Sequence, residues 1–430
     1  MCRRWVTGVL VALSVAAPCA AQAGPGVGTA EPVRMTFRET IARAVERNPS
    51  GRQAAEEILR ADALVRQVRA TALPGVSASV TTTSLTQEYA AGGSVITPQN
   101  QVVASAAAAV PIYAPVQWAQ RVQAMDNRQV AELAAADVRR QVAVAAAQAY
   151  LAVLARQREL DASLSARDTA RAHYEFARQR RENGAGSRLN ELRAQQSLSS
   201  VEVLVELTQA GLYRAQEALG VLVAADGPVA AADEPVLDVP PSLGTAVAAM
   251  GSARTDLRLA GAREKAAERV VSDSWKDWLP SVSALFSGQA SAPSTAYPPT
   301  FYGRFQVAAT VPIFDSGSRG GKKAEREVQL RETRIAIEGL MRQATSDVRA
   351  AEASVARAER AAASARAAAQ QAREVVDIVN VSFKVGASTN IEVIDAQRVS
   401  LDADTASVVA EDQVRQARLS LLVALGRFPQ

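Results

Sequence analysis

The chain has 430 residues, with 48 Lys and Arg against 44 Asp and Glu, so its formal net charge is only +4. A balance this close to neutral gives no reason to expect nucleic acid as a partner. Aromatic residues make up 4% of the chain and alanine is abundant. This composition disfavours a bulky compact core and favours long helices that pack closely.

The N-terminus has the pattern of a secretory signal peptide. Its three parts follow in order: the pair Arg3-Arg4, the apolar run 5–17, and the cleavage site Ala21-Gln22-Ala23. We predict a signal peptide over residues 1–23; a membrane anchor would need about 20 apolar residues, more than this run offers. Both cysteines, Cys2 and Cys19, lie within the segment, so the processed chain has neither disulfides nor thiolate metal sites.

A first structural repeat is predicted over residues 36–223, after a Gly- and Pro-rich leader at 24–35 that shows no periodicity. Alternating β-branched and small residues predict a β-hairpin over about 76–113. A long helical hairpin follows over about 116–223, because only one glycine-bearing turn interrupts it. At 1.5 Å per residue, its first arm of ~68 residues would be roughly 100 Å long.

The same plan recurs over residues 243–427, after a linker at 224–242. Its β-hairpin is expected over about 282–314 and its helical hairpin over about 319–425. Matching motifs precede and follow the two β-hairpins in the same order: Leu73-Pro-Gly-Val76 and Leu279-Pro-Ser-Val282, then Val110-Pro-Ile-Tyr113 and Val311-Pro-Ile-Phe314. We therefore interpret the chain as a duplication.

The predicted strands suggest a membrane wall that one chain cannot close. Phe301, Phe305 and Val307 share one face of an alternating strand, as in the lipid-facing wall of a barrel. Four strands cannot close a barrel, and an open edge does not persist in lipid. The long helices also need neighbours to bury their apolar stripes. The sequence thus predicts a closed oligomer, with a barrel attached to a hollow helical cylinder.

Residues 36–427 resemble the TolC-type outer-membrane efflux proteins. Besides the duplicated motifs, the resemblance rests on Phe314-Asp-Ser-Gly-Ser-Arg319 and on Val385-Gly386 followed by Ile391-Glu-Val-Ile-Asp-Ala-Gln397. It implies a mainly α fold with a membrane β part, in a homotrimer whose twelve-stranded β-barrel continues as a long periplasmic α-helical barrel. Such a protein is an exit duct in the outer membrane for tripartite efflux or type I secretion. It is not an enzyme and has no cofactor; its partners are outer-membrane lipid, a periplasmic adaptor and an inner-membrane transporter.

The resemblance also points to an entrance at the helical hairpin tips. Glu392 and Asp395 match the acidic pair that lines the family's constriction, and three copies would form a cation-selective ring; the alternative is two ordinary solvated helix acids. Asn190 stands where an acid often sits, and Ser388 where a basic partner often sits. The residues expected to contact the adaptor are Gly184, Gly186, Ser187, Gly386, Ala387 and Ser388.

Nothing in the sequence indicates catalysis or a metal site. The single histidine, His173, is expected to be solvated or to lie in an interface. Residues 317–323 fail the phosphate-loop pattern because Lys323 stands where Ser or Thr is needed. The alternative function is a periplasmic coiled-coil adaptor or scaffold that does not enter the outer membrane, and the exported substrate cannot be read from the sequence.

Overall fold

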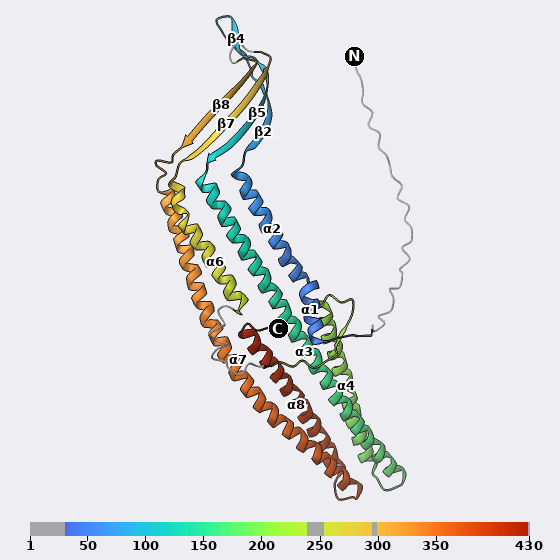
Figure 1. The fold of residues 1–430 in the computed structure, drawn as a ribbon. Helices are drawn as coiled ribbons and strands as arrows, with labels where there is room; N and C mark the ends of the chain where they lie inside the picture. The colour runs from blue at the N-terminus through green and yellow to red at the C-terminus, as the bar shows by residue number, and fades with distance from the viewer. Residues whose placement is uncertain (1–30, 239–252, 295–298, 429–430) are drawn as a thin grey trace, which may run out of the picture.

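The computed structural model describes residues 31–238, 253–294 and 299–428. These residues form an elongated molecule with a sheet at one end and two helical hairpins at the other (Figure 1). The predicted signal peptide lies outside the described residues. So do most of the leader and parts of the linker and of the second repeat.

Long helices form most of the molecule. The two longest, α3 and α7, have 68 and 67 residues and turn back into α4 and α8, each of 35 residues. The helices are α1 (Phe37–Arg47), α2 (Pro49–Thr71), α3 (Pro115–Glu182), α4 (Arg188–Leu222), α6 (Thr255–Ser272), α7 (Ser318–Lys384) and α8 (Asn390–Ala424), with a short 3-10 turn η1 (Ser274–Trp278) after α6.

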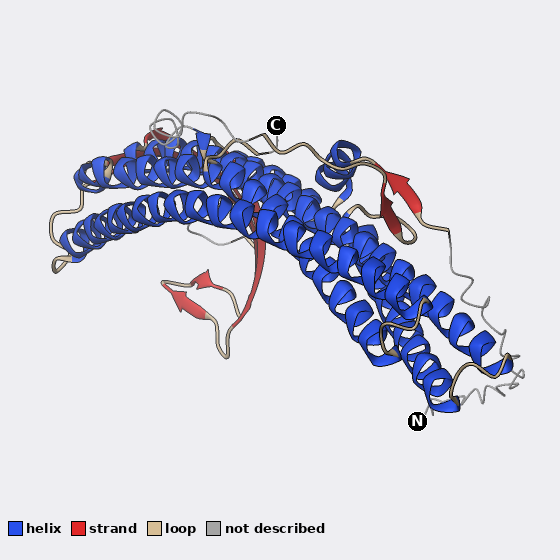
Figure 2. Ribbon diagram, turned by 90° about the horizontal axis from the view of Figure 1, so that it is seen from below, coloured by secondary structure: helices blue, strands red, loops and turns tan. Residues whose placement is uncertain are grey.

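Alanine lets these helices pack closely around α3. Its residues Ala143, Ala146 and Ala147 are all 0% exposed, and α3 contacts α1, α2, α4, α6 and α8. Small side chains allow neighbouring helix axes to approach, whereas a full coat of leucine would hold them apart. Seen from below, the helices form one curved layer rather than a compact bundle (Figure 2).

The sheet joins the two β-hairpins of the chain. Its strands are β2 (Gly75–Ser84), β5 (Asn100–Tyr113), β7 (Ser281–Ala292) and β8 (Phe301–Thr310). They lie in the order β2-β5-β7-β8, and every neighbouring pair is antiparallel. The strands β2 and β8 are therefore the two edges of the sheet, although they come from opposite halves of the chain.

A smaller hairpin lies between β2 and β5. Its strands are β3 (Tyr89–Ala91) and β4 (Ser94–Thr97), paired with each other and with no other strand of the described chain. Gly92 and Gly93 form its turn at φ values of 59° and 82°, which glycine adopts without steric cost. This hairpin lies on the concave side of the helical layer (Figure 2).

The leader and the linker meet in a parallel pair that the sequence did not indicate. Strand β1 (Val33–Met35) pairs with β6 (Val229–Ala231) beside the middle of α3. Tyr150 of α3, which is 0% exposed, accepts hydrogen bonds from the backbone N–H groups of Ala232 and Asp233 at 3.2 and 3.1 Å. Burial and the hydrogen bond with the Asp233 carboxylate raise the pKa of Tyr150 to about 12. Its hydroxyl thus fixes this segment to the helical shaft.

Candidate functional site

The two faces of the four-stranded sheet differ in polarity. Cross-strand register places Phe286 opposite Phe305 and Ala290 opposite Phe301, and these residues share one face with Val76, Val80, Ala104, Ala108 and Val307. The other face carries Ser77, Ser79, Thr81, Ser105, Ser287, Gln289, Tyr302, Arg304 and Gln306. This separation is the pattern of a wall with lipid on one side and water on the other.

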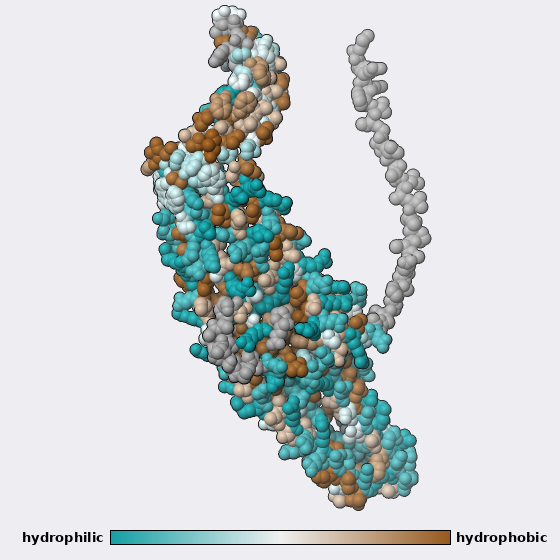
Figure 3. All heavy atoms as spheres, in the orientation of Figure 1, coloured by the Kyte–Doolittle hydropathy of each residue, from teal (hydrophilic) through white to brown (hydrophobic). Residues whose placement is uncertain are grey.

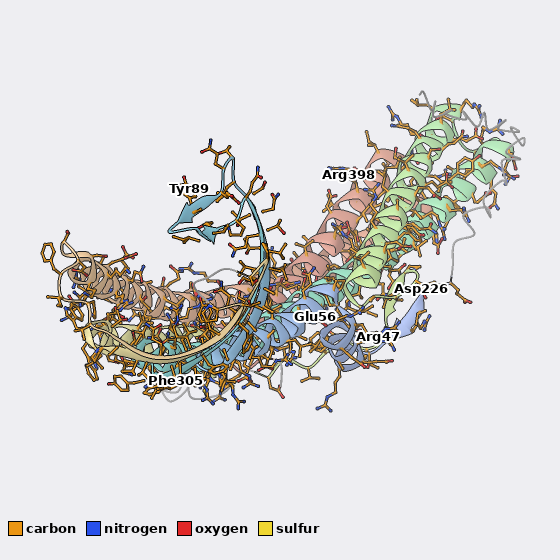
Figure 4. All side chains as sticks on the ribbon, turned by 90° about the horizontal axis from the view of Figure 1, so that it is seen from above. Arg47, Glu56, Tyr89, Asp226, Phe305 and Arg398 are labelled. Atoms are coloured by element: carbon orange, nitrogen blue, oxygen red, sulfur yellow. The ribbon has the colours of Figure 1, made fainter. Side chains whose placement is uncertain are left out.

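The apolar face is uncovered. Phe301 is 72% exposed and Phe305 is 70% exposed. Apolar colour gathers over the sheet, whereas the helical shaft is mostly hydrophilic (Figure 3). Viewed from above, the strands form an arc, and Phe305 lies on its outer side (Figure 4). An apolar surface of this extent marks a contact with lipid or with another protein.

The polar face is held together by its own side chains. The hydroxyls of Ser79 and Ser105 are 2.8 Å apart, and Tyr302 donates a hydrogen bond of 2.9 Å to Gln289. Both bonds join neighbouring strands, so they support the register that keeps the two faces distinct.

Tryptophans surround the foot of the sheet, where the strands give way to helices. Trp118 in the first turn of α3 packs edge-on against Tyr113, with ring centroids 5.5 Å apart. Trp275 and Trp278 of η1 are 57% and 42% exposed, and the Arg319 guanidinium lies 5.8 Å from the centre of the Trp278 ring. Exposed tryptophans beside cations are typical of a membrane–water interface.

At the opposite end of the molecule, the two hairpin tips have the same backbone design. Gly184 and Gly386 adopt left-handed conformations with φ of 75° and 84°. In each tip the next residue donates its backbone N–H to a carbonyl five positions earlier: Ala185 to Arg180, and Ala387 to Ser382, both at 2.8 Å. This is the Schellman arrangement, which ends a helix and reverses the chain.

Capping residues begin the return helices. The Ser187 side chain accepts from the backbone N–H of Asn190 at 3.2 Å. In the second tip, the Thr389 hydroxyl accepts from the Glu392 N–H, and the Glu392 carboxylate accepts from the Thr389 N–H at 2.7 Å. This reciprocal capping box stabilises the start of α8. The spacing Thr-x-x-Glu was visible in the sequence and would have predicted it.

The acidic pair expected at the entrance lies on the exposed side of α8. Glu392 and Asp395 are exposed, whereas Val393 and Ala396 are buried against the rest of the protomer. Asp395 pairs with Arg398 at 3.0 Å, so part of its charge is compensated along its own helix. The pair therefore faces away from the packed hairpins. Within the described residues, no hydrogen bond or ion pair links it to the first tip.

A buried hydrogen-bonded bridge joins the two helical hairpins just above their tips. The Nε2 atom of His173 in α3 lies 2.8 Å from Oδ1 of Asn390, the first residue of α8, and Nδ2 of Asn390 donates to the carbonyl of Asn190 at 3.3 Å. His173 and Asn390 are only 6% and 3% exposed. Burial lowers the pKa of His173, and the Asn390 hydrogen bond opposes this effect, so the ring is neutral at neutral pH.

An aromatic cluster surrounds this bridge. Phe383 of α7, which is 6% exposed, lies 5.3 Å from the His173 ring and 5.8 Å from the Phe176 ring, measured between centroids. The Arg180 guanidinium lies 5.6 Å from the centre of the Phe383 ring. The sequence placed His173 in a solvent-exposed position or an interface, and the structure places it in the contact between hairpins. No local pattern predicted its partner, which is 217 residues away.

The described residues contain no group of three or more His, Cys, Asp or Glu that could hold a metal ion. Within the same ranges, no helix is both long enough and apolar enough to cross a bilayer.

Comparison with known proteins agrees with this geometry. The outer membrane efflux protein family matches residues 40–225 and 250–427; among curated proteins, none matches. A membrane protein from Pseudomonas aeruginosa is 22% identical with a TM-score of 0.77, over 90% of this chain and 93% of that one. The Campylobacter jejuni CmeC outer membrane channel is 14% identical with a TM-score of 0.75, over 91% of this chain and 85% of that one.

The open state of the Neisseria gonorrhoeae MtrE outer membrane channel is 19% identical with a TM-score of 0.74, over 92% of this chain and 90% of that one. At such identities these structures show a shared fold. The family match covers most of the chain, including both helical hairpins and both halves of the sheet. The chain therefore belongs to the outer membrane efflux protein family, in the outer membrane with its long helices in the periplasm.

Proposed function

We propose that three copies of this chain form an exit duct that carries substrates from an inner-membrane transporter across the periplasm and the outer membrane. The observation that carries the proposal is the sheet, which has one apolar face, one polar face and two edges without a partner strand in the described chain. In a bilayer such edges must be paired, because no water is available to satisfy them.

Three chains close the wall without changing its strand pattern. Four strands from each of three chains make twelve, and strand directions alternate through β2, β5, β7 and β8. The edge strand β8 of one chain would therefore meet β2 of the next in antiparallel register. The convex apolar side would face lipid, and the concave polar side would line the pore.

The helical layer would continue this pore into the periplasm. Each structural repeat, 36–223 and 243–427, supplies two strands and one helical hairpin to the assembly. The exposed apolar residues of the helices, such as Leu207, Ile335 and Ile378, would be buried against neighbouring chains. At the far end, the glycine-bearing tips would contact a periplasmic adaptor, and Glu392 with Asp395 would line the entrance.

A cysteine pair across the proposed seam tests the assembly. Thr81 of β2 and Gln306 of β8 lie on the polar face of the two edge strands, and both cysteines of the chain precede residue 24. The double variant Thr81→Cys/Gln306→Cys, with neighbouring positions scanned to find the register, should form covalent dimers and trimers on oxidation. A matched pair within one chain, Thr81→Cys/Val103→Cys, should leave the chain monomeric on a denaturing gel.

Single-channel recording tests the conduit itself. The purified full-length protein should insert into planar bilayers and produce stable ion currents, and it should co-fractionate with outer membranes. A folded protein that remains in the periplasmic fraction and inserts nowhere would instead support the adaptor or scaffold reading.

A further inference from the structure

The wall of the proposed pore has an unusual distribution of charge. The four strands of the sheet contain no aspartate and no glutamate, and their one charged residue is Arg304 in β8. Glu88 is the acidic residue at the outer end of the sheet, and it lies outside these strands, between β2 and β3. Arg304 therefore has no counterion within the wall.

Strand register decides which way Arg304 faces. Arg304 lies opposite Ser287, with Ala107 and Ser77 next in the same row. It falls on the polar face with Tyr302 and Gln306, and the side chain is exposed. Because side chains alternate along a strand, its neighbours Gly303 and Phe305 fall on the apolar face.

Arg304 lies in the outer half of strand β8. Strand β8 enters the sheet at Phe301, at the end remote from the helices (Figure 1), and Arg304 follows three residues later, roughly 10 Å along the strand. If three chains share one barrel, three guanidinium groups lie at the same height and project into the same lumen. The other side chains of this face are uncharged: they carry hydroxyls and amides or are apolar, as Leu285 is.

We propose that Arg304 forms a cationic ring near the exit of the pore and selects for anionic solutes, in particular those bearing a carboxylate or phosphate. This inference rests on the proposed trimeric duct. Arginine is always charged, and its planar fork of donors matches both anions. Rings of basic side chains are the usual origin of anion preference in pores. The alternative is that Arg304 faces lipid and binds lipid phosphates. The strand register contradicts this alternative, because it places Arg304 on the polar face.

The expected size of the effect follows from Coulomb's law. Three charges about 10 Å from the axis, screened at about 0.1 M salt, raise the local ratio of anions to cations roughly fivefold. The effect grows at about 0.01 M salt, where the Debye length reaches about 30 Å. An acidic ring at the periplasmic entrance would act in series with opposite sign, so the experiment must separate the two.

Reversal potentials under a potassium chloride gradient, and then under potassium benzoate as a carboxylate probe, test the proposal. They are measured on the full trimer in wild-type form and in the background Glu392→Gln/Asp395→Asn. In both, Arg304→Gln should lower the anion-to-cation permeability ratio roughly two- to fivefold, and Arg304→Lys should preserve it. Gln306→Arg, added to Arg304→Gln, returns the charge to the same face and should restore the ratio.

Chemical modification of an assembled channel avoids the question of folding. Arg304→Cys should react from the aqueous side with a methanethiosulfonate carrying a trimethylammonium group and regain anion preference, whereas a sulfonate reagent should shift it towards cations. Val307→Cys on the apolar face is the matched control, and its currents should not respond. If the trimer conducts but no change at residue 304 alters its selectivity, this inference is wrong while the proposed duct stands. A wild-type protein that forms no channel overturns the proposed function, and the inference with it.

Discussion

Nε2 of His173 and Oδ1 of Asn390 lie 2.8 Å apart in a buried contact between the first and second helical hairpins. Asn390 is the first residue of α8, directly beside the second tip, and its amide also reaches the carbonyl of Asn190 beside the first tip. One side chain thus holds both return helices at a fixed separation. In the proposed duct, this contact sets how the tips of one protomer sit at the entrance.

Replacing Asn390 by alanine should weaken this contact. The change removes two hydrogen bonds and leaves a buried imidazole nitrogen unpaired, which costs roughly 1–3 kcal/mol. We expect a lower thermal unfolding midpoint and larger or noisier single-channel currents from loosened tips. Asn190→Ala is the matched control, because Asn190 contributes only its backbone carbonyl to the bridge. Equal losses in both variants would show that the bridge has no special role.

The same contact should respond to acid. The pKa of His173 is lowered in the folded protein, mainly by burial, so the unfolded chain binds a proton more readily than the folded one. Stability from the neutral ring is therefore fully present above the unfolded pKa of about 6.5 and is lost as pH falls through the lowered folded value. Wild type should lose more thermal stability between about pH 8 and pH 5 than His173→Gln. Identical pH profiles would contradict this.

Tyr150→Phe should destabilise the attachment of the β1–β6 pair. Without the hydroxyl, the backbone N–H of Asp233 loses its partner at a part-buried site, and the N–H of Ala232 keeps only its hydrogen bond to the Met35 carbonyl. We expect a cost of roughly 1–3 kcal/mol. Thermal unfolding and proteolysis after residue 231 should both report the loss. Tyr213→Phe, at a residue 38% exposed, should change the unfolding free energy by no more than about 0.5 kcal/mol.

Gly186→Ala should distort the first tip. A Cβ at this position would lie 2.9 Å from the backbone nitrogen of Arg181 and 3.1 Å from the carbonyl carbon of Arg180, so the turn itself must shift. We expect a loss of roughly 1–3 kcal/mol and faster proteolysis at the tip. Ser388 holds the equivalent position in the second tip, and Ser388→Ala should leave both measurements near wild type. An unchanged proteolysis rate in Gly186→Ala would show that the turn accommodates the methyl group.

Neutralising the acidic pair should change ion selectivity at the entrance. Glu392→Gln/Asp395→Asn removes up to six carboxylates from a trimer, and glutamine preserves the capping interaction with Thr389. Cation preference in planar bilayers should fall roughly twofold to tenfold. Asp402→Asn, farther along the exposed side of α8, should have a smaller effect. If the double variant forms pores with unchanged selectivity, the proposed duct stands, but these two residues do not form its entrance ring.

Local patterns in the sequence indicated the types of element and several candidate residues. The mainly helical fold follows from long glycine-free segments, and the apolar strand face follows from the alternation around Phe301 and Phe305. Gly184 and Gly386 mark the tips because a helix that reverses needs a residue tolerant of positive φ. Glu392 and Asp395 were named from the resemblance to the TolC-type proteins, and their role at the entrance stays a prediction.

Tertiary structure alone decided which distant segments meet. The placement of β5 beside β7, the pairing of β1 with β6, and the bridge from His173 to Asn390 join residues that are far apart in sequence. Periodicity shows which face of a segment is apolar, but it does not show which other segment covers that face. Each of these contacts instead depends on the closure of long loops and on packing that the whole chain must satisfy together.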